Sequence, residues 1–494
     1  MKKLNYWMFL CCVVLYQQTN YAQTNQWESF YSYNSTSNAA PFGQKLVVAA
    51  ENALLIYDTS SETSQKITTV DGLSGDVISA VAVYNSMVLI GHANGLVAQY
   101  DTTSQKITYD NSIERNPNLI ATQKQINHIH LNGDTAFLAT GFGIVELNPS
   151  TLEFGDTYYF GPLGNRIEVI QAYVFQNKLY AATVQGLYSS SVSNPQILEF
   201  SSWDMHSTGK WVSLWHHGTD LFGAIDEGSA TSLNRIGATI EQKTRYAGTF
   251  RNVFKNEEGV VLALRNKIIL FDLVELSTVT EVSSIPGIKA HTFMFAHRRR
   301  NYFLIGTSSN GLVRYEATEE PQFLSPDGPL LNNIFDIETL ENELWISHGD
   351  YSIFYVPGLK KYGISHYVDS QWKNISNDAL FNVDSIVRVV AHPYEIGTLY
   401  ACSFHGGIVQ LKDNLPEELW NASNSGLESL TFEGDNYVSI RVRDAVVDDQ
   451  GNLWSLTSLI ERGLKKVSPS GQWSSYDLTE IIFDYTHEDG YSNM

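Results

Sequence analysis

Cysteine, charged residues and long apolar runs are all scarce in this chain of 494 residues. Two of its 3 cysteines, Cys11 and Cys12, lie in the first apolar stretch, so its removal would leave Cys402 alone. A single cysteine excludes an intrachain disulfide, and stability must then come from packing. No later segment offers the roughly 18 consecutive apolar residues that a membrane-spanning helix requires. The sequence therefore predicts no transmembrane link to a cytoplasmic domain.

Basic residues are the rarer kind of charge, and charged residues together make up only 17% of the chain. The formal net charge of −21 argues against nucleic acid as a partner, since that interaction requires a basic surface. Apolar residues at 43% and aromatic residues at 12% are enough to bury a large core, which excludes global disorder. The remaining polarity comes from Ser, Thr, Asn, Gln, Gly and Tyr, a composition typical of exported β-proteins.

Sequence motifs of catalysis are also missing. The chain has no G-x-S-x-G, no H-E-x-x-H and no glycine-rich phosphate loop. We therefore predict a protein that is not an enzyme and has no catalytic residues, no metal site and no cofactor. A glycan-active enzyme whose site is assembled from distant loops is the alternative.

The first 22 residues have the pattern of a signal peptide. A basic start is followed by an apolar stretch over Tyr6–Tyr16 and a small residue, Ala22, which predicts cleavage before Gln23. The residues before Cys11 and Cys12 are not the small pair of a lipobox, so lipidation is not expected. The sequence predicts an exported protein.

One phrase recurs through the whole chain and governs the fold prediction. In Ala80–Asp101 it consists of an alternating apolar run, a tight turn, a second apolar run, a glycine turn and a third run. Further copies are Ile129–Asn148, Ala172–Ser189, Val253–Asp272, Phe293–Glu316, Ile337–Val356, Val389–Leu411 and Ala445–Val467. Period-two alternation marks strands with a buried face, and no long window has a helical period.

A repeat of about 40–45 residues with four strands is typical of a β-propeller blade. Seven such units fit before residue 320, and longer copies follow. We predict an all-β protein with a signal peptide over 1–22, a seven-bladed β-propeller over 23–320 and an incomplete second β-propeller of about three blades over 321–494. A series of β-sandwiches or a solenoid is the alternative. The segment Trp27–Tyr33 is predicted to form the outer strand of the last blade and lock the ring, and Ser325–Gly328 to begin the second propeller.

The start of the predicted mature chain resembles a known family. The residues Q-W-E-S-F-Y-S-Y-N, then L-V-V-A-A-E-N-A-L-L-I-Y-D and D-G-L-S-G-D-V-I, resemble the PorZ family of the Bacteroidetes type IX secretion system. The blade phrase is also similar to the regulator propellers of Bacteroidetes sensor proteins. The resemblance implies two seven-bladed propellers, a C-terminal sorting domain, a complex with a PorU-like sortase, and delivery of anionic lipopolysaccharide to it. This sequence ends at Met494 without a sorting domain, so we expect a fragment or a shortened relative.

The resemblance predicts a non-enzymatic surface component of type IX secretion that is exported to the cell surface or outer membrane. Its expected partners are the PorU-like sortase, outer-membrane secretion proteins and anionic lipopolysaccharide or another glycan. The alternative is the extracytoplasmic ligand-sensing propeller of a hybrid two-component regulator, for which a periplasmic location would be expected. No transmembrane helix or transmission domain follows the repeats, which disfavours a sensor.

The long segment Asn111–Gln125 exceeds the usual hairpin length, and long loops on a rigid scaffold commonly carry function. It is expected to share one face with the turns between second and third strands. The candidate binding residues on that face are Asn94, Arg115, Lys124, Phe142, Gln185 and Asn310. We predict that a polar ligand, carbohydrate or protein, docks there, and that shortening the segment spares stability.

Other clusters have structural explanations that are favoured over functional ones. His128-x-His130 and His216-His217 are predicted to pack or line the channel rather than bind a metal, because no third ligand lies at the right spacing. Arg298–Arg300 could contact an anion, but a solvated hairpin is favoured. Asp448–Asn452 and Asn256–Gly259 resemble calcium ligands, yet lack the spacing of a calcium loop and are interpreted as turns.

Overall fold

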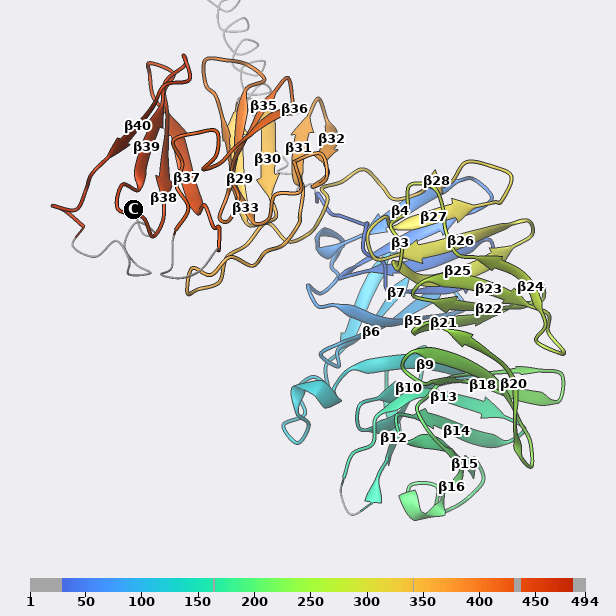
Figure 1. The fold of residues 1–494 in the computed structure, drawn as a ribbon. Helices are drawn as coiled ribbons and strands as arrows, with labels where there is room; N and C mark the ends of the chain where they lie inside the picture. Colours follow the sequence, from blue (N-terminus) through green and yellow to red (C-terminus); the bar gives the residue numbers. More distant parts are fainter. Residues whose placement is uncertain (1–28, 163–164, 341, 431–436, 483–494) are drawn as a thin grey trace, which may run out of the picture.

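The computed structural model describes residues 29–162, 165–340, 342–430 and 437–482, which form ten four-stranded antiparallel sheets (Figure 1). The predicted signal peptide lies outside the described residues. Short 3₁₀ turns occur at η1 (Thr69–Asp71), η2 (Ala121–Gln123) and η4 (Phe200–Ser202). No helix in these described ranges is long and apolar enough to cross a bilayer. The prediction of an all-β protein is confirmed.

Each sheet takes four strands that are consecutive in sequence. The strands of the first seven sheets are β1 (Asn38–Phe42), β2 (Lys45–Ala50), β3 (Ala53–Asp58), β4 (Thr63–Ile67), β5 (Ile78–Tyr84), β6 (Met87–His92), β7 (Val97–Asp101), β8 (Lys106–Asp110), β9 (Ile126–Asn132), β10 (Thr135–Thr140), β11 (Gly143–Leu147), β12 (Phe154–Tyr159), β13 (Val169–Phe175), β14 (Lys178–Thr183), β15 (Gly186–Ser191), β16 (Asp204–Thr208), β17 (Trp211–His217), β18 (Asp220–Asp226), β19 (Ala230–Ile236), β20 (Ile240–Ala247), β21 (Phe250–Lys255), β22 (Val260–Leu264), β23 (Lys267–Phe271), β24 (Thr278–Val282), β25 (Phe293–Arg299), β26 (Tyr302–Thr307), β27 (Leu312–Tyr315) and β28 (Gln322–Phe323). The last three sheets contain β29 (Asp336–Leu340), β30 (Glu343–Ser347), β31 (Ile364–Val368), β32 (Gln371–Ile375), β33 (Ile386–Ala391), β34 (Leu399–Ser403), β35 (Gly407–Lys412), β36 (Leu415–Trp420), β37 (Val442–Val447), β38 (Leu453–Thr457), β39 (Leu464–Val467) and β40 (Trp473–Tyr476).

The inner strands of each sheet in the ring are buried on both faces. Successive side chains of a strand point to opposite sides, so they pack against both neighbouring sheets. In β5, Ala80 and Ala82 join the hydrophobic core shared with the third sheet, whereas Val81 joins the core shared with the first sheet. The outer strands are polar instead, and β4 is exposed at all positions except its last. Apolar residues on both faces of a strand therefore require a neighbouring sheet on each side.

The first strands of six sheets of the ring lie innermost. β1, β5, β9, β13, β17 and β21 all contribute to the lining of one central cavity. Polar side chains on several of these strands donate hydrogen bonds to backbone carbonyls of the next sheet. The bonds run from Ser79 to Ile126, from Asn127 to Val169 and from Gln171 to Leu214, at 2.7, 2.9 and 3.1 Å.

The ring closes without the predicted exchange of a strand. The described part of Trp27–Tyr33 contains no strand, and β28 supplies the fourth strand of the seventh sheet. Because that edge position is already filled, the N-terminal segment has no ladder to join and is held by single hydrogen bonds. The Thr36 amide donates to the Thr307 carbonyl at 2.9 Å, and the Gly311 amide donates to the Asn34 carbonyl at 2.7 Å.

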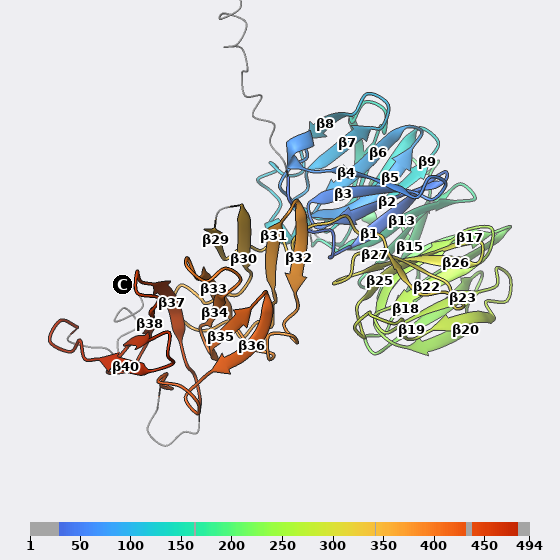
Figure 2. The ribbon, with the colours of Figure 1, turned by 90° about the horizontal axis from the view of Figure 1, so that it is seen from above.

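The last three sheets form a second unit beside the ring (Figures 1 and 2). The N-terminal segment joins the two units, since Phe30 packs on Tyr367 and Trp372 with ring centroids 4.7 and 5.6 Å apart. The Ser32 amide also donates to Asn332 Oδ1 at 2.8 Å. Residue 320 falls between β27 and β28, and the exact domain boundary stays a prediction.

Gly311 offers a direct test of ring closure. It has a φ of +65°, and a Cβ there would lie 2.6 Å from the Tyr33 carbonyl oxygen and even closer to Ser325 Oγ. Gly133 has a similar φ of +59° but open space around its Cβ position, so it is a matched control. We expect Gly311→Ala to lower the free energy of unfolding by about 1–3 kcal/mol more than Gly133→Ala, measured by urea unfolding. Equal effects of the two variants would contradict a stabilising role for this closure contact.

Candidate binding face

The segment Asn111–Gln125 folds back onto the turn between β6 and β7. Asn94 in that turn donates a hydrogen bond to Glu114 Oε1 at 3.1 Å, and Lys124 Nζ donates to the Glu114 carbonyl. Gly95 has a φ of +91°, and a Cβ there would lie 2.7 Å from Ile113. The structure therefore brings Asn94 and Lys124 together around Glu114, while Arg115 is exposed on the same segment.

Two apolar side chains anchor the segment in the core. Ile113 is 6% exposed and Leu119 is 5% exposed, and both belong to the hydrophobic core between the second and third sheets. This burial argues against the expectation that shortening the segment would spare stability. The segment is a structural part of the ring as well as the long connection between β8 and β9 (Figure 1).

Phe142 is buried rather than presented on the surface. It is 2% exposed and lies in the same core as Ile113 and Leu119, with its ring 5.8 Å from that of Tyr159. The prediction that Phe142 contacts a ligand is therefore wrong, because its buried side chain packs beneath the segment. Its position in an A-T-G-F-G turn gave no sign of burial, because residues that pack with it, such as Ile113 and Leu119, lie elsewhere in the sequence.

Gln185 and Asn310 occupy the corresponding turns of other sheets. The Gln185 carbonyl accepts from the Gly209 amide at 3.1 Å, and the Asn310 amide donates to Thr307 Oγ1 at 2.8 Å. Both lie on different sheets from the Asn94 turn, so the candidate residues are spread around the ring rather than gathered in one pocket. Their predicted binding role stays a prediction.

The second unit lies on the same side of the ring as Asn111–Gln125 (Figure 1). Its Asn332 side chain donates to Glu51 Oε2, in the turn between β2 and β3, at 3.0 Å. Asn34 donates to the Leu330 carbonyl at 3.2 Å. The second unit thus contacts this face near the first and seventh sheets. The sequence analysis did not predict this contact, although the aromatic run near Phe30 lies in the connecting segment.

Arg298–Arg300 form the hairpin between β25 and β26, and two of the arginines hold neighbouring sheets together. Arg299 donates to the Gly43 carbonyl of the first sheet at 2.8 Å. Arg298 lies 3.6 Å from Glu258 of the sixth sheet and stacks over Phe303. The predicted hairpin is correct, but these two side chains stabilise the ring rather than being merely solvated.

The histidine pairs are used in packing. His130 Nε2 accepts a hydrogen bond from the Val174 amide at 3.0 Å, and His216 Nδ1 lies 2.7 Å from Tyr173 Oη. Burial lowers the pKa of His128 to about 4 and the pKa of His130 to about 3, which keeps both rings neutral at physiological pH. In the described ranges, no three His, Cys, Asp or Glu side chains are grouped so that they could hold a metal ion.

The calcium-like sequences are hairpins whose oxygen atoms are already engaged. Asp448 accepts hydrogen bonds from Trp454 Nε1 at 2.8 Å, the Asn452 amide at 2.8 Å and the Gln450 amide at 3.0 Å. These bonds lower the pKa of Asp448 to about 2, and the bond from Trp454 has the largest effect. In the other sequence, Asn256 Oδ1 accepts from the Glu258 amide at 2.9 Å.

Comparison with known proteins gives the same fold. Residues 46–204, from β2 to the start of β16, match the family model described as the TSS9, PorZ, N-terminal beta-propeller domain. The structure of PorZ from Porphyromonas gingivalis is similar with a TM-score of 0.77 at 16% identity, over 92% of this chain and 61% of that chain. The extracellular domain of a hybrid two-component system from B. thetaiotaomicron matches with a TM-score of 0.46 at 16% identity, over 91% of this chain and 59% of that one. No curated protein sequence matches the chain.

The resemblance to PorZ is thereby confirmed, and so is the propeller fold. This chain spans about 61% of the length of the PorZ structure that it matches. That PorZ is an essential bacterial surface component of the type-IX secretion system of P. gingivalis.

Leu119 and Ile120 test whether Asn111–Gln125 is part of the core. Leu119 is 5% exposed and its neighbour Ile120 is 65% exposed. We expect Leu119→Ala to cost about 2–4 kcal/mol in urea unfolding, because it leaves a cavity. Ile120→Ala is the matched control, with an expected change within about 0.5 kcal/mol. A Leu119→Ala variant as stable as the control would show that the segment does not contribute to the core.

Proposed function

We propose that this PorZ-like propeller is a non-enzymatic component of type IX secretion that is exported and acts at the cell surface or outer membrane. The observation that carries the proposal is the match of residues 46–204 to the PorZ N-terminal propeller model. The similarity of the whole described fold to PorZ supports it as well. The function is binding, since the surface loops are held at fixed positions by a ring of sheets.

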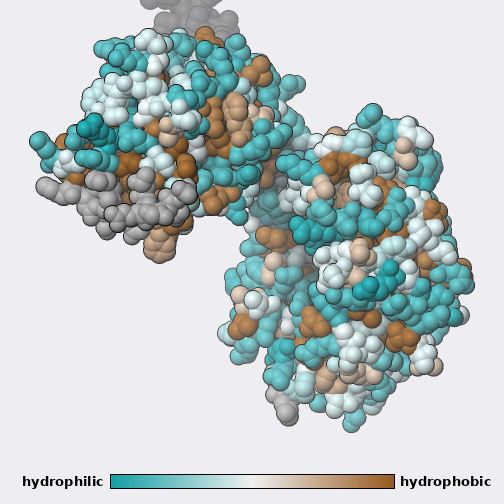
Figure 3. All heavy atoms as spheres, in the orientation of Figure 1, coloured by the Kyte–Doolittle hydropathy of each residue, from teal (hydrophilic) through white to brown (hydrophobic). Residues whose placement is uncertain are grey.

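The candidate binding face has the chemistry expected for a protein or glycan partner. Its turns present amides and hydroxyls, and Arg115 adds an exposed cation. Hydrophobic residues are scattered among hydrophilic ones on the side of the ring seen in Figure 3. A partner there would be held by hydrogen bonds and charge, which gives specificity through geometry. We propose a PorU-like sortase and outer-membrane secretion proteins as partners, and anionic lipopolysaccharide as a ligand.

Deletion and co-purification test the proposal. We expect deletion of the coding sequence to stop the maturation and surface attachment of type IX cargo, and the affinity-tagged protein to co-purify with a sortase-like protein. Arg115→Glu is expected to weaken that co-purification severalfold, because it reverses an exposed charge in the long loop. Arg235→Glu is the matched control, since Arg235 lies near the end of β19, at the opposite end of the sheet from the β18–β19 turn, and pairs with Asp220.

Normal cargo maturation in the deletion strain, together with a monomer that captures no secretion protein, would contradict the proposal. A deletion that instead changes transcription in response to an external glycan would favour a sensor.

A further inference from the structure

The central cavity of the ring is unusual in its charge. It has a volume of about 490 Å³ and is lined by the innermost strands. The chain has 53 acidic and 32 basic residues, yet none of the described residues that line this cavity is acidic. The lining includes two cations, Arg251 and Lys255, and neutral polar groups such as Asn252 and Ser213. A cavity free of carboxylates in an acidic protein offers a local environment that favours an anion.

Arg251 has no partner within the described part of the protein. Its guanidinium makes no ion pair or hydrogen bond there, and its Nε is buried without an acceptor. A carboxylate that acts on it through space, Asp226, is already paired with Lys210 at 2.8 Å. Burial lowers the pKa of Arg251, and the nearby Arg265 lowers it further. A partly buried arginine whose Nε lacks an acceptor is costly unless an acceptor is supplied from outside.

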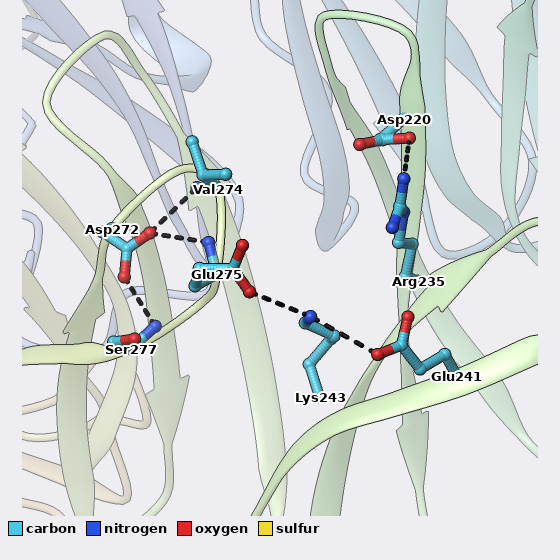
Figure 4. A network of polar contacts seen from close by, with 8 residues as sticks. All are labelled: Asp220, Arg235, Glu241, Lys243, Asp272, Val274, Glu275 and Ser277. Atoms are coloured by element: carbon cyan, nitrogen blue, oxygen red, sulfur yellow. Dashed lines mark hydrogen bonds and ion pairs between the residues drawn. The ribbon is translucent and has the colours of Figure 1, made fainter.

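The polar groups around Arg251 are free because of where they lie in the ring. Among the described residues, no hydrogen bond joins β17 to β21, in contrast to the bonds that link several other inner strands. This seam is tied at its outer edge instead. Lys243 of β20 lies 3.4 Å from Glu241 and 3.1 Å from Glu275 of the next sheet (Figure 4).

The loop that carries Glu275 is itself held in place. Asp272 accepts hydrogen bonds from the Val274, Glu275 and Ser277 amides at 2.9, 2.8 and 2.7 Å (Figure 4). Burial alone would raise the pKa of Asp272, but these bonds lower it overall. The fifth and sixth sheets can therefore stay together without polar contacts at the cavity. Ser213 and Asn252 also make no side-chain hydrogen bond there, so both remain available at the same seam as Arg251.

We propose that the central cavity is a binding site for a small polyhydroxylated oxyanion, such as a carboxylated or phosphorylated monosaccharide, with Arg251 as its anion-binding residue. The guanidinium donates paired hydrogen bonds to a carboxylate or phosphate group. The amide of Asn252 and the hydroxyl of Ser213 suit the hydroxyls of such a molecule. The cavity volume lies within the usual range of small-molecule sites, about 300–1,000 Å³. This site is separate from the candidate binding face and does not rest on the proposed function.

Calorimetric titration of the whole chain tests the site with D-glucuronate, glucose 6-phosphate and neutral glucose. We expect glucuronate and glucose 6-phosphate to bind and glucose not to bind, because the anionic group supplies the missing counter-ion of Arg251. Binding of glucose 6-phosphate alone would assign the site to phosphate, and binding of glucuronate alone would assign it to carboxylate. Binding of neither anion, or equal binding of glucose, would overturn the proposal.

Arg251→Gln distinguishes a ligand contact from a structural one. We expect it to weaken binding of the anionic probe about tenfold or more, since a charged hydrogen-bonding group is lost. Its thermal stability should be unchanged or higher, because no partner is lost on folding. Arg235→Gln, at an outer hairpin, should leave binding unchanged, and Arg251→Lys should retain part of it. Unaltered binding by Arg251→Gln, or a variant that is destabilised or fails to fold, would overturn the assignment.

Discussion

The inner strands of each sheet must bury both of their faces, and the rest of the ring depends on this constraint. A strand such as β5 carries apolar residues toward both of its neighbours, so a sheet at an open edge would expose one apolar face to water. A closed ring of sheets removes such edges. The contacts of Thr36 with Thr307 and of Arg299 with Gly43 matter for this reason, because they join the first sheet to the seventh.

The same constraint decides what polar side chains are free to do. Several polar groups near the axis are engaged between sheets, as with Asn127 and Gln171, and Arg299 serves the same purpose at the rim. Groups without such a contact are therefore informative. Arg251 is such a group, because the fifth and sixth sheets are held together by hydrophobic packing and by Lys243 at the outer edge.

The second unit changes the meaning of the loop face. It contacts the ring through Phe30 to Asn34 and through Asn332, at the turns of the first and seventh sheets. The N-terminal segment thus both closes the ring and holds the second unit, so the two parts share one connection. A partner that approaches the loop Asn111–Gln125 would meet a face already bounded by the second unit on one side.

Local patterns in the sequence determined the strands, the tight turns and the blade repeat, because alternation and glycine position depend only on neighbouring residues. They also determined that β9 and β17 lie innermost and that Arg298–Arg300 form a hairpin. Only the tertiary structure decided how the ring closes, that Phe142 is buried beneath a loop, and that Arg251 has no partner. These features depend on residues that are far apart in the chain, such as Asn34 with Gly311 or Phe142 with Leu119. A single sequence carries no signal for such pairs, since each side chain reads as an ordinary turn or strand residue until the ring brings its partner near.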